Sequence, residues 1–138
     1  MIHELTCGRT LQRESLYGLE GVCLVEGLLT SRLQADVEEE LSKASITVLL
    51  RSEVGLADPL LYINVNIHKL DELFFYSIHV ELHQLVTLVR DPSIELQAPT
   101  WNVGSVGSVG SMNLYQIRGA VKKHIQTFIG DYQLTSVN

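Results

Sequence analysis

Three side chains in the second half of the sequence have the types that bind metal ions or transfer protons. They are His79, Glu81 and His83, spaced two residues apart. On a β-strand this spacing places all three on one face, with neighbours about 7 Å apart. Two imidazoles and a carboxylate can hold zinc or a similar ion, so these residues are candidates for a metal site. The alternative is a solvated sheet face on which His and Glu are ordinary polar residues.

A triplet of Val, Gly and Ser recurs three times over residues 103–111, directly before an amphipathic segment. Small residues at a helix N-terminus let backbone amides approach an anion closely. This interpretation predicts an anion-binding site made by Gly104, Ser105, Gly107, Ser108, Gly110 and Ser111. The run has neither the lysine of a P-loop nor the spacing of a dinucleotide-binding fingerprint. The alternative is therefore a connector that binds nothing.

Motifs for catalysis are otherwise missing from the sequence. It contains no recognisable nucleophile elbow, no Cys–His signature and no pair of acids at the end of a predicted strand. We therefore assign no catalytic residue and no cofactor.

The composition narrows the classes of protein and partner. The chain has 138 residues, 46% of them hydrophobic and 19% charged, as expected for one folded domain. Its net charge of −6 argues against binding to nucleic acid, which requires clustered Lys and Arg. No apolar run approaches the roughly 18 residues of a membrane-spanning helix. The two cysteines, Cys7 and Cys23, are too few for a disulfide framework, and a bridge between them would require an exported chain.

Alternation of apolar and polar side chains predicts two strands, at residues 60–68 and 74–90. Their simplest arrangement is an antiparallel hairpin with the polar side chains together on one face. The second strand exceeds the usual 3–10 residues, so we expect a bulge or a bend near Gln84. The shared polar face is the predicted interaction surface, and it consists of Asn64, Asn66, His68, Ser77, His79, Glu81 and His83.

Apolar residues spaced three or four apart predict two helices, at residues 31–44 and 112–132. Ser31 and Gln34 fit a capping box, and Ser111 is the expected N-cap of the second helix. Three further strands are expected, and they lie at residues 20–28, 45–51 and 94–103.

These elements predict a two-layer α/β (α+β) sandwich, with a mixed sheet of four to five strands and two helices on one face. The order is β-α-β-β-β-(β)-α, and the first helix should make a right-handed crossover between parallel strands. Residues 1–16 are expected to be a flexible arm without a regular element. Residues 17–133 would form a single domain, and residues 134–138 a tail.

Several sequence runs resemble a group of conserved bacterial proteins without assigned activity, some of which carry export signals. The runs are LYINVNI, YSIHVEL, LVRDPS, TWNVGSVG and FIGDY, and the resemblance spans residues 16–133. The order of elements is also similar to small periplasmic domains, such as the N-terminal domain of the Tol-system translocation protein and the lipoprotein activators of cell-wall synthases. That second similarity is one of architecture only, so it implies no function.

The sequence favours a non-enzymatic interaction module that binds a protein partner, or a second copy of itself, through the polar sheet face. The resemblance implies a place in the cell envelope. The alternative is an enzyme that depends on a metal or small ligand and uses His79, Glu81 and His83 with the anion site. The N-terminal residues lack the pattern of a signal peptide, so the chain as written would be cytoplasmic, and periplasmic if its true start lies upstream.

Overall fold

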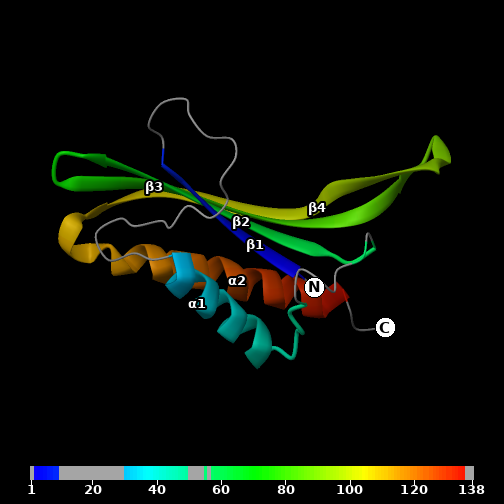
Figure 1. Cartoon of the computed structure of the whole chain (residues 1–138), viewed down its shortest axis with the longest axis horizontal. Helices are drawn as coiled ribbons and strands as arrows, with labels where there is room; N and C mark the ends of the chain where they lie inside the picture. The colour runs from blue at the N-terminus through cyan, green and yellow to red at the C-terminus, as the bar shows by residue number, and fades with distance from the viewer. Residues whose placement is uncertain (1, 10–29, 50–54, 56, 136–138) are drawn as a thin grey trace.

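A computed structural model describes residues 2–9, 30–49, 55 and 57–135 of the chain. Its sheet has the strand order β1-β2-β3-β4. β1 (Ile2–Arg9) pairs in parallel with β2 (Leu60–Leu70), whereas β3 (Leu73–Leu88) pairs antiparallel with both β2 and β4 (Asp91–Gly110). Two helices, α1 (Thr30–Lys43) and α2 (Tyr115–Thr135), lie side by side under one face of this sheet (Figure 1).

The predicted fold class is wrong. We expected a two-layer α/β (α+β) sandwich with a mixed sheet of four to five strands. The structure instead has an α+β arrangement, in which three long antiparallel strands, β2 to β4, follow one another directly between the two helices. These strands form a meander because short turns connect them, and such turns join only antiparallel neighbours.

The strand expected at residues 45–51 is also wrong, because residues 46–49 are neither strand nor helix. α1 ends at Lys43, and Ser45 just beyond it has a φ of 60°, the left-handed conformation that commonly terminates helices. The amide of Ile46 then donates to the carbonyl of Leu41 at 2.9 Å. Ile46 and Val48 still pack against the core. Their apolar side chains gave the segment the sequence pattern of a strand, although it does not form one.

At the N-terminus the structure has a strand where none was predicted. Residues 2–9, expected to lie in an arm without regular structure, form β1 beside β2. Backbone pairing creates this strand, and such pairing leaves little trace in a short, polar sequence. The strand expected at residues 20–28 lies outside the described residues.

Other elements agree with the local patterns. Residues 31–44 and 74–90 were predicted as a helix and a long strand, and the structure has α1 at residues 30–43 and β3 at residues 73–88. The predicted bulge is confirmed by a register shift between Leu82 and His83. The expected cap at Ser111 is wrong, because Ser111 begins a short 3-10 turn, η2 (Ser111–Asn113), and α2 starts only at Tyr115.

The core lies between the sheet and the helices. Side chains from β2 and β3 that point toward the helices are almost fully buried, and α1 and α2 supply a matching apolar stripe. The main members are Leu33, Val37, Leu41, Leu61, Ile63, Val65, Phe74, Ile78, Val80, Ile117, Val121, Ile125 and Phe128. The helices cover this face, whereas no helix of the described residues covers the opposite face of β2 and β3.

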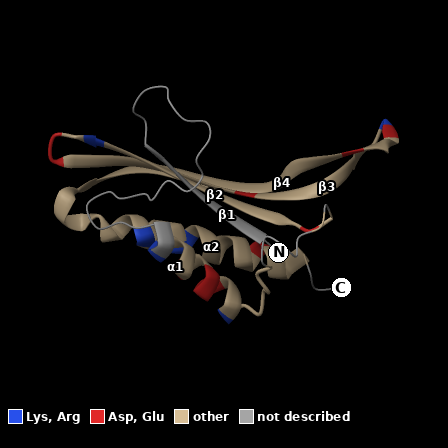
Figure 2. Cartoon of the chain, viewed as in Figure 1, with Lys and Arg blue, Asp and Glu red and all other residues tan. Residues whose placement is uncertain are grey.

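Charged groups join the two helices to each other. Arg118 of α2 makes a two-pronged contact with Asp36 of α1, at 2.8 and 2.9 Å. Glu40, only 8% exposed, contacts Lys122 at 3.5 Å and Gln126 at 3.2 Å. In Figure 2 the ribbon positions of Lys, Arg, Asp and Glu lie on the two helices and at the turns at the ends of the sheet, whereas most of the length of the strands is uncharged. No helix in the described ranges is long and apolar enough to cross a membrane.

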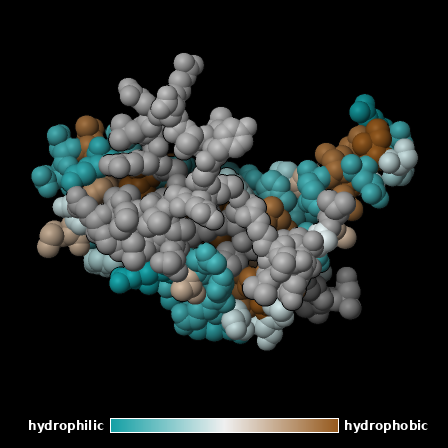
Figure 3. Space-filling view, viewed as in Figure 1, coloured by the Kyte–Doolittle hydropathy of each residue, from teal (hydrophilic) through white to brown (hydrophobic). Residues whose placement is uncertain are grey.

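The far ends of β3 and β4 extend beyond the rest of the sheet as a two-stranded arm (Figure 1). β2 pairs with β3 only as far as His83, so residues 84–98 have no third strand among the described residues. Apolar side chains remain exposed there, and Figure 3 shows them as brown patches near the tip. They include Leu85, Val89, Ile94 and Leu96.

Candidate functional site

The register of β2 and β3 brings the predicted polar residues together. Asn64 lies opposite His79, and Asn66 lies opposite Ser77. Their apolar neighbours along each strand are buried under the helices, so strand alternation turns the polar side chains to the other side. We call this side of β2 and β3 the open face. It carries Asn64, Asn66, His68, Ser77, His79, Glu81 and His83.

Glu81 links the two histidines beside it. One carboxylate oxygen lies 2.8 Å from His79 Nε2, and the other lies 2.6 Å from His83 Nε2. The hydrogen bond with His83 holds the pKa of Glu81 below its usual value, and His79 adds to this effect, although partial burial opposes it. Tyr62 packs edge-on against the His83 ring, with centroids 6.0 Å apart.

This arrangement differs from that of a metal site. Both imidazoles direct Nε2 at the carboxylate, so these nitrogens take part in hydrogen bonds within the trio. Among the residues that the structure describes, no three His, Cys, Asp or Glu side chains are arranged to hold an ion. The geometry therefore favours a hydrogen-bonded cluster in which Glu81 orients its two neighbours.

A second polar group occupies the middle of the open face. Asn66 Nδ2 donates to the Asn64 side-chain oxygen, and the same amide lies 3.4 Å from the Ser77 hydroxyl. All three side chains are half-buried, so they are held in place yet still reach solvent. Amides and a hydroxyl can both donate and accept hydrogen bonds, which suits recognition of uncharged polar groups.

Two adjoining hollows give the open face a concave surface. The larger, about 690 Å³, is lined by Tyr62, Asn64, His79, Glu81 and Gly104 among others. The smaller, about 450 Å³, lies toward His68, Phe75 and Ser108. Asn66, Ser77 and Val106 border both, so the hollows form one shallow trough along the strands.

The predicted anion site has a different structure from the one expected. Residues 104–110 belong to β4 rather than to a loop at a helix N-terminus. The prediction is therefore wrong in its physical basis, since strand amides lack the converging geometry of a helix end. Gly104, Ser108 and Gly110 lie on the open side of β4, whereas Ser105 and Gly107 face the helices.

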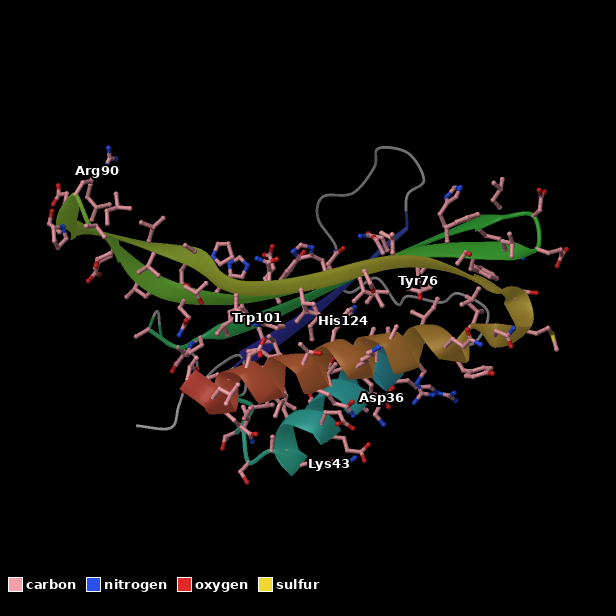
Figure 4. The ribbon with its side chains drawn as sticks, turned by 180° about the vertical axis from the view of Figure 1, so that it is seen from behind. Asp36, Lys43, Tyr76, Arg90, Trp101 and His124 are labelled. Atoms are coloured by element: carbon pink, nitrogen blue, oxygen red, sulfur yellow. The ribbon has the colours of Figure 1, made fainter. Side chains whose placement is uncertain are left out.

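Ser105 and Gly107 have packing roles on the helix side. The Ser105 hydroxyl lies 2.7 Å from His124 Nε2, which α2 directs at the sheet (Figure 4). Burial lowers the pKa of His124, and the neighbouring Lys123 acts in the same direction. Gly107 leaves room for the Tyr76 ring, because a Cβ there would lie 2.6 Å from the phenol oxygen.

Sequence reasoning missed some residues of the trough. Val106 is 83% exposed on the open side and borders both hollows, but the repeat had suggested an anion site or a connector. Gly104 brings the β4 backbone close to His79, since a Cβ there would lie 3.4 Å from Nδ1. The repeat has a period of three, which does not match the period of two of a strand, so these residues carried no signal for the side on which Val106 lies.

Comparison with known proteins gives no further guidance. No protein-family model matches the chain, and no curated protein is significantly similar to it.

Proposed function

We propose that this chain is a protein-interaction module whose open face binds a polypeptide segment of a partner protein. The observation that carries the proposal is the trough of two adjoining hollows along β2 and β3. From Tyr62 to His68 it spans six residue steps, or about 20 Å of strand. That length accommodates about six extended residues, or about 13 residues of a helix.

The chemistry of the trough indicates what kind of segment would fit. Its centre presents the amides of Asn64 and Asn66 and the hydroxyl of Ser77. Phe75 and Val106, which are 42% and 83% exposed, add apolar borders. This combination suits a segment with uncharged polar side chains and a few apolar ones. We further propose a partner in the cell envelope, which rests only on the resemblance of the sequence runs given above and has no support from a family model or a curated protein.

Selection of peptides tests this proposal. A random peptide library displayed on phage is panned against the full chain, and enriched peptides are measured by calorimetry. Asn66→Arg fills the trough and should weaken binding at least about tenfold. Gln116→Arg is the matched control, because it makes a similar change on the exposed surface of α2 and should leave the affinity unchanged.

Two results would contradict the proposal. One is that no enriched peptide distinguishes Asn66→Arg from Gln116→Arg. The other is that the peptides perturb NMR signals of α1 and α2 while leaving those of Asn64, Ser77 and His79 unchanged.

A further inference from the structure

The outer edge of β4 has two parts, and only one of them carries residues that discourage pairing with another strand. β4 is the last strand of the sheet, and within the described ranges no strand pairs with its outer edge. Exposed edges usually carry prolines or charges that discourage pairing with another chain. The distal part has such residues at Asp91, Pro92, Glu95 and Pro99, whereas residues 101–110 contain no charge and no proline.

The unprotected part of β4 is complementary to itself. If two copies run antiparallel with Val106 opposite Val106, each residue meets a partner of suitable size. Val103 then lies opposite Val109, and the small residues Gly104 and Ser108 lie opposite each other, as do Ser105 and Gly107. This symmetry follows from the repeat VGSVGSV, which places valines at both ends and at the centre. No charged residue meets its own copy within this register.

The position of Val106 adds a second, independent argument. This side chain is 83% exposed, although it lies on a strand whose other large apolar residues nearby are at least partly buried. Val103 and Val109 face the helices, whereas Val106 alternates to the open side. Pairing across a twofold axis would place the two Val106 side chains against each other, and β-branched pairs stabilise neighbouring strands.

We propose that two copies of the chain associate by antiparallel pairing of β4, with a twofold axis at Val106. The sheet then continues from one copy into the other, and the two open faces lie on the same side. This inference concerns the edge of the sheet and does not depend on peptide binding in the trough. Because one strand pair is a small interface, we expect a dissociation constant on the order of micromolar.

Charge substitutions at the axis test the register. Val106→Lys and Val106→Glu each place like charges opposite one another, so sedimentation of either variant alone should show dimerisation weakened at least about tenfold. An equimolar mixture should recover the dimer, because lysine then faces glutamate. Circular dichroism verifies that both variants fold, as expected for substitutions at an exposed side chain.

Cross-linking tests the same register without altering charge. In Val106→Cys the two Cα atoms would lie about 4.5–5.5 Å apart, within the range that a disulfide spans. Ser77→Cys is the matched control, because Ser77 is the β3 neighbour of Val106 on the same face. Its two copies would lie about 14 Å apart, which is too far for a disulfide. Peptide mapping distinguishes the new bond from any that involve Cys7 or Cys23.

Several results would overturn the inference. A wild-type chain that sediments as a 15.4 kDa monomer at concentrations up to about 1 mM would do so. So would a Val106→Lys variant that dimerises like the wild type, a mixture that remains monomeric, or equal cross-linking of Val106→Cys and Ser77→Cys. Val106 also borders the trough, so peptide binding is measured on the wild-type chain and on Asn66→Arg rather than on the Val106 variants. The proposed function can therefore be judged separately from dimerisation.

Discussion

The two faces of the β2–β3 hairpin differ in how their side chains are satisfied. On the helix side, Ile63 and Val80 are fully buried and contribute through removal of apolar surface from water. On the open face, polar side chains hydrogen-bond mainly to one another and remain in reach of solvent. The helix side of the hairpin therefore stabilises the fold. The open face has ordered side chains that contribute little to the stability of the fold. Substitutions should reveal this difference in a graded way.

The largest effect is expected from a core residue of β2, and its neighbour on the open face provides the comparison. Ile63→Ala should lower the free energy of unfolding by about 2–5 kcal/mol, because it opens a cavity in the core. Asn64→Ala should cost no more than about 1 kcal/mol, since its hydrogen bonds can be replaced by water. Urea unfolding measures both. Equal losses would mean that the open face is packed as tightly as the core.

A smaller effect is expected where β4 passes under Tyr76. Gly107→Ala places a methyl group 2.6 Å from the phenol oxygen and should cost about 1–3 kcal/mol. In a Tyr76→Ala background the same substitution should cost little, because the ring is gone. Gly130→Ala is the control, since a Cβ there meets nothing within 4 Å, and it should stabilise α2 by about 0.4–1 kcal/mol. A Gly107 penalty that persists without Tyr76 would refute this explanation.

The contact between the helices should make stability depend on acid. The hydrogen bond from Arg118 lowers the pKa of Asp36 below 3.8, the usual value for this carboxyl in an unfolded chain. A lowered pKa contributes stability at pH values above that reference, and the contribution is lost as pH falls through the folded-state pKa. Asp36→Asn should therefore cost about 1 kcal/mol at pH 7 and progressively less below about pH 4.

Urea unfolding at a series of pH values measures this dependence. Glu95→Gln, on the exposed arm, is the control for the removal of one negative charge. If Asp36→Asn and Glu95→Gln gave the same pH profile, the Asp36–Arg118 pair would contribute nothing specific.

The smallest effect is expected on the open face. Hydrogen bonds from the histidines lower the pKa of Glu81 below 4.5, so the carboxylate stabilises the fold above that pH and this contribution is lost in acid. Because this cluster is partly exposed, Glu81→Gln should cost less than about 1 kcal/mol at neutral pH. NMR should show displaced ring signals of His79 and His83 with the rest of the sheet unchanged. A loss of unfolding free energy as large as that of Ile63→Ala would show that the cluster is required for the stability of the fold.

Local sequence patterns were sufficient to predict the elements that have one buried side and one solvated side. The helix at residues 30–43 and the hairpin of β2 and β3 could be predicted, because one side of each element is buried and the other is solvated. The same period of two placed Asn64, His79 and Glu81 on a common face. Glu81 as the bridge between both histidines follows from rotamers, which the spacing alone does not determine.

Contacts between distant segments decided the rest. The Val-Gly-Ser repeat has the composition of a connector, yet it forms a strand because β3 offers a partner and Tyr76 needs the space at Gly107. Residues 46–49 have the composition of a strand, yet in the structure they are neither strand nor helix. Asp36 and Arg118, 82 positions apart, meet only because both helices cover the same face. Periodicity shows which side of an element avoids water, whereas strand pairing depends on which segments the packed core brings within hydrogen-bonding distance.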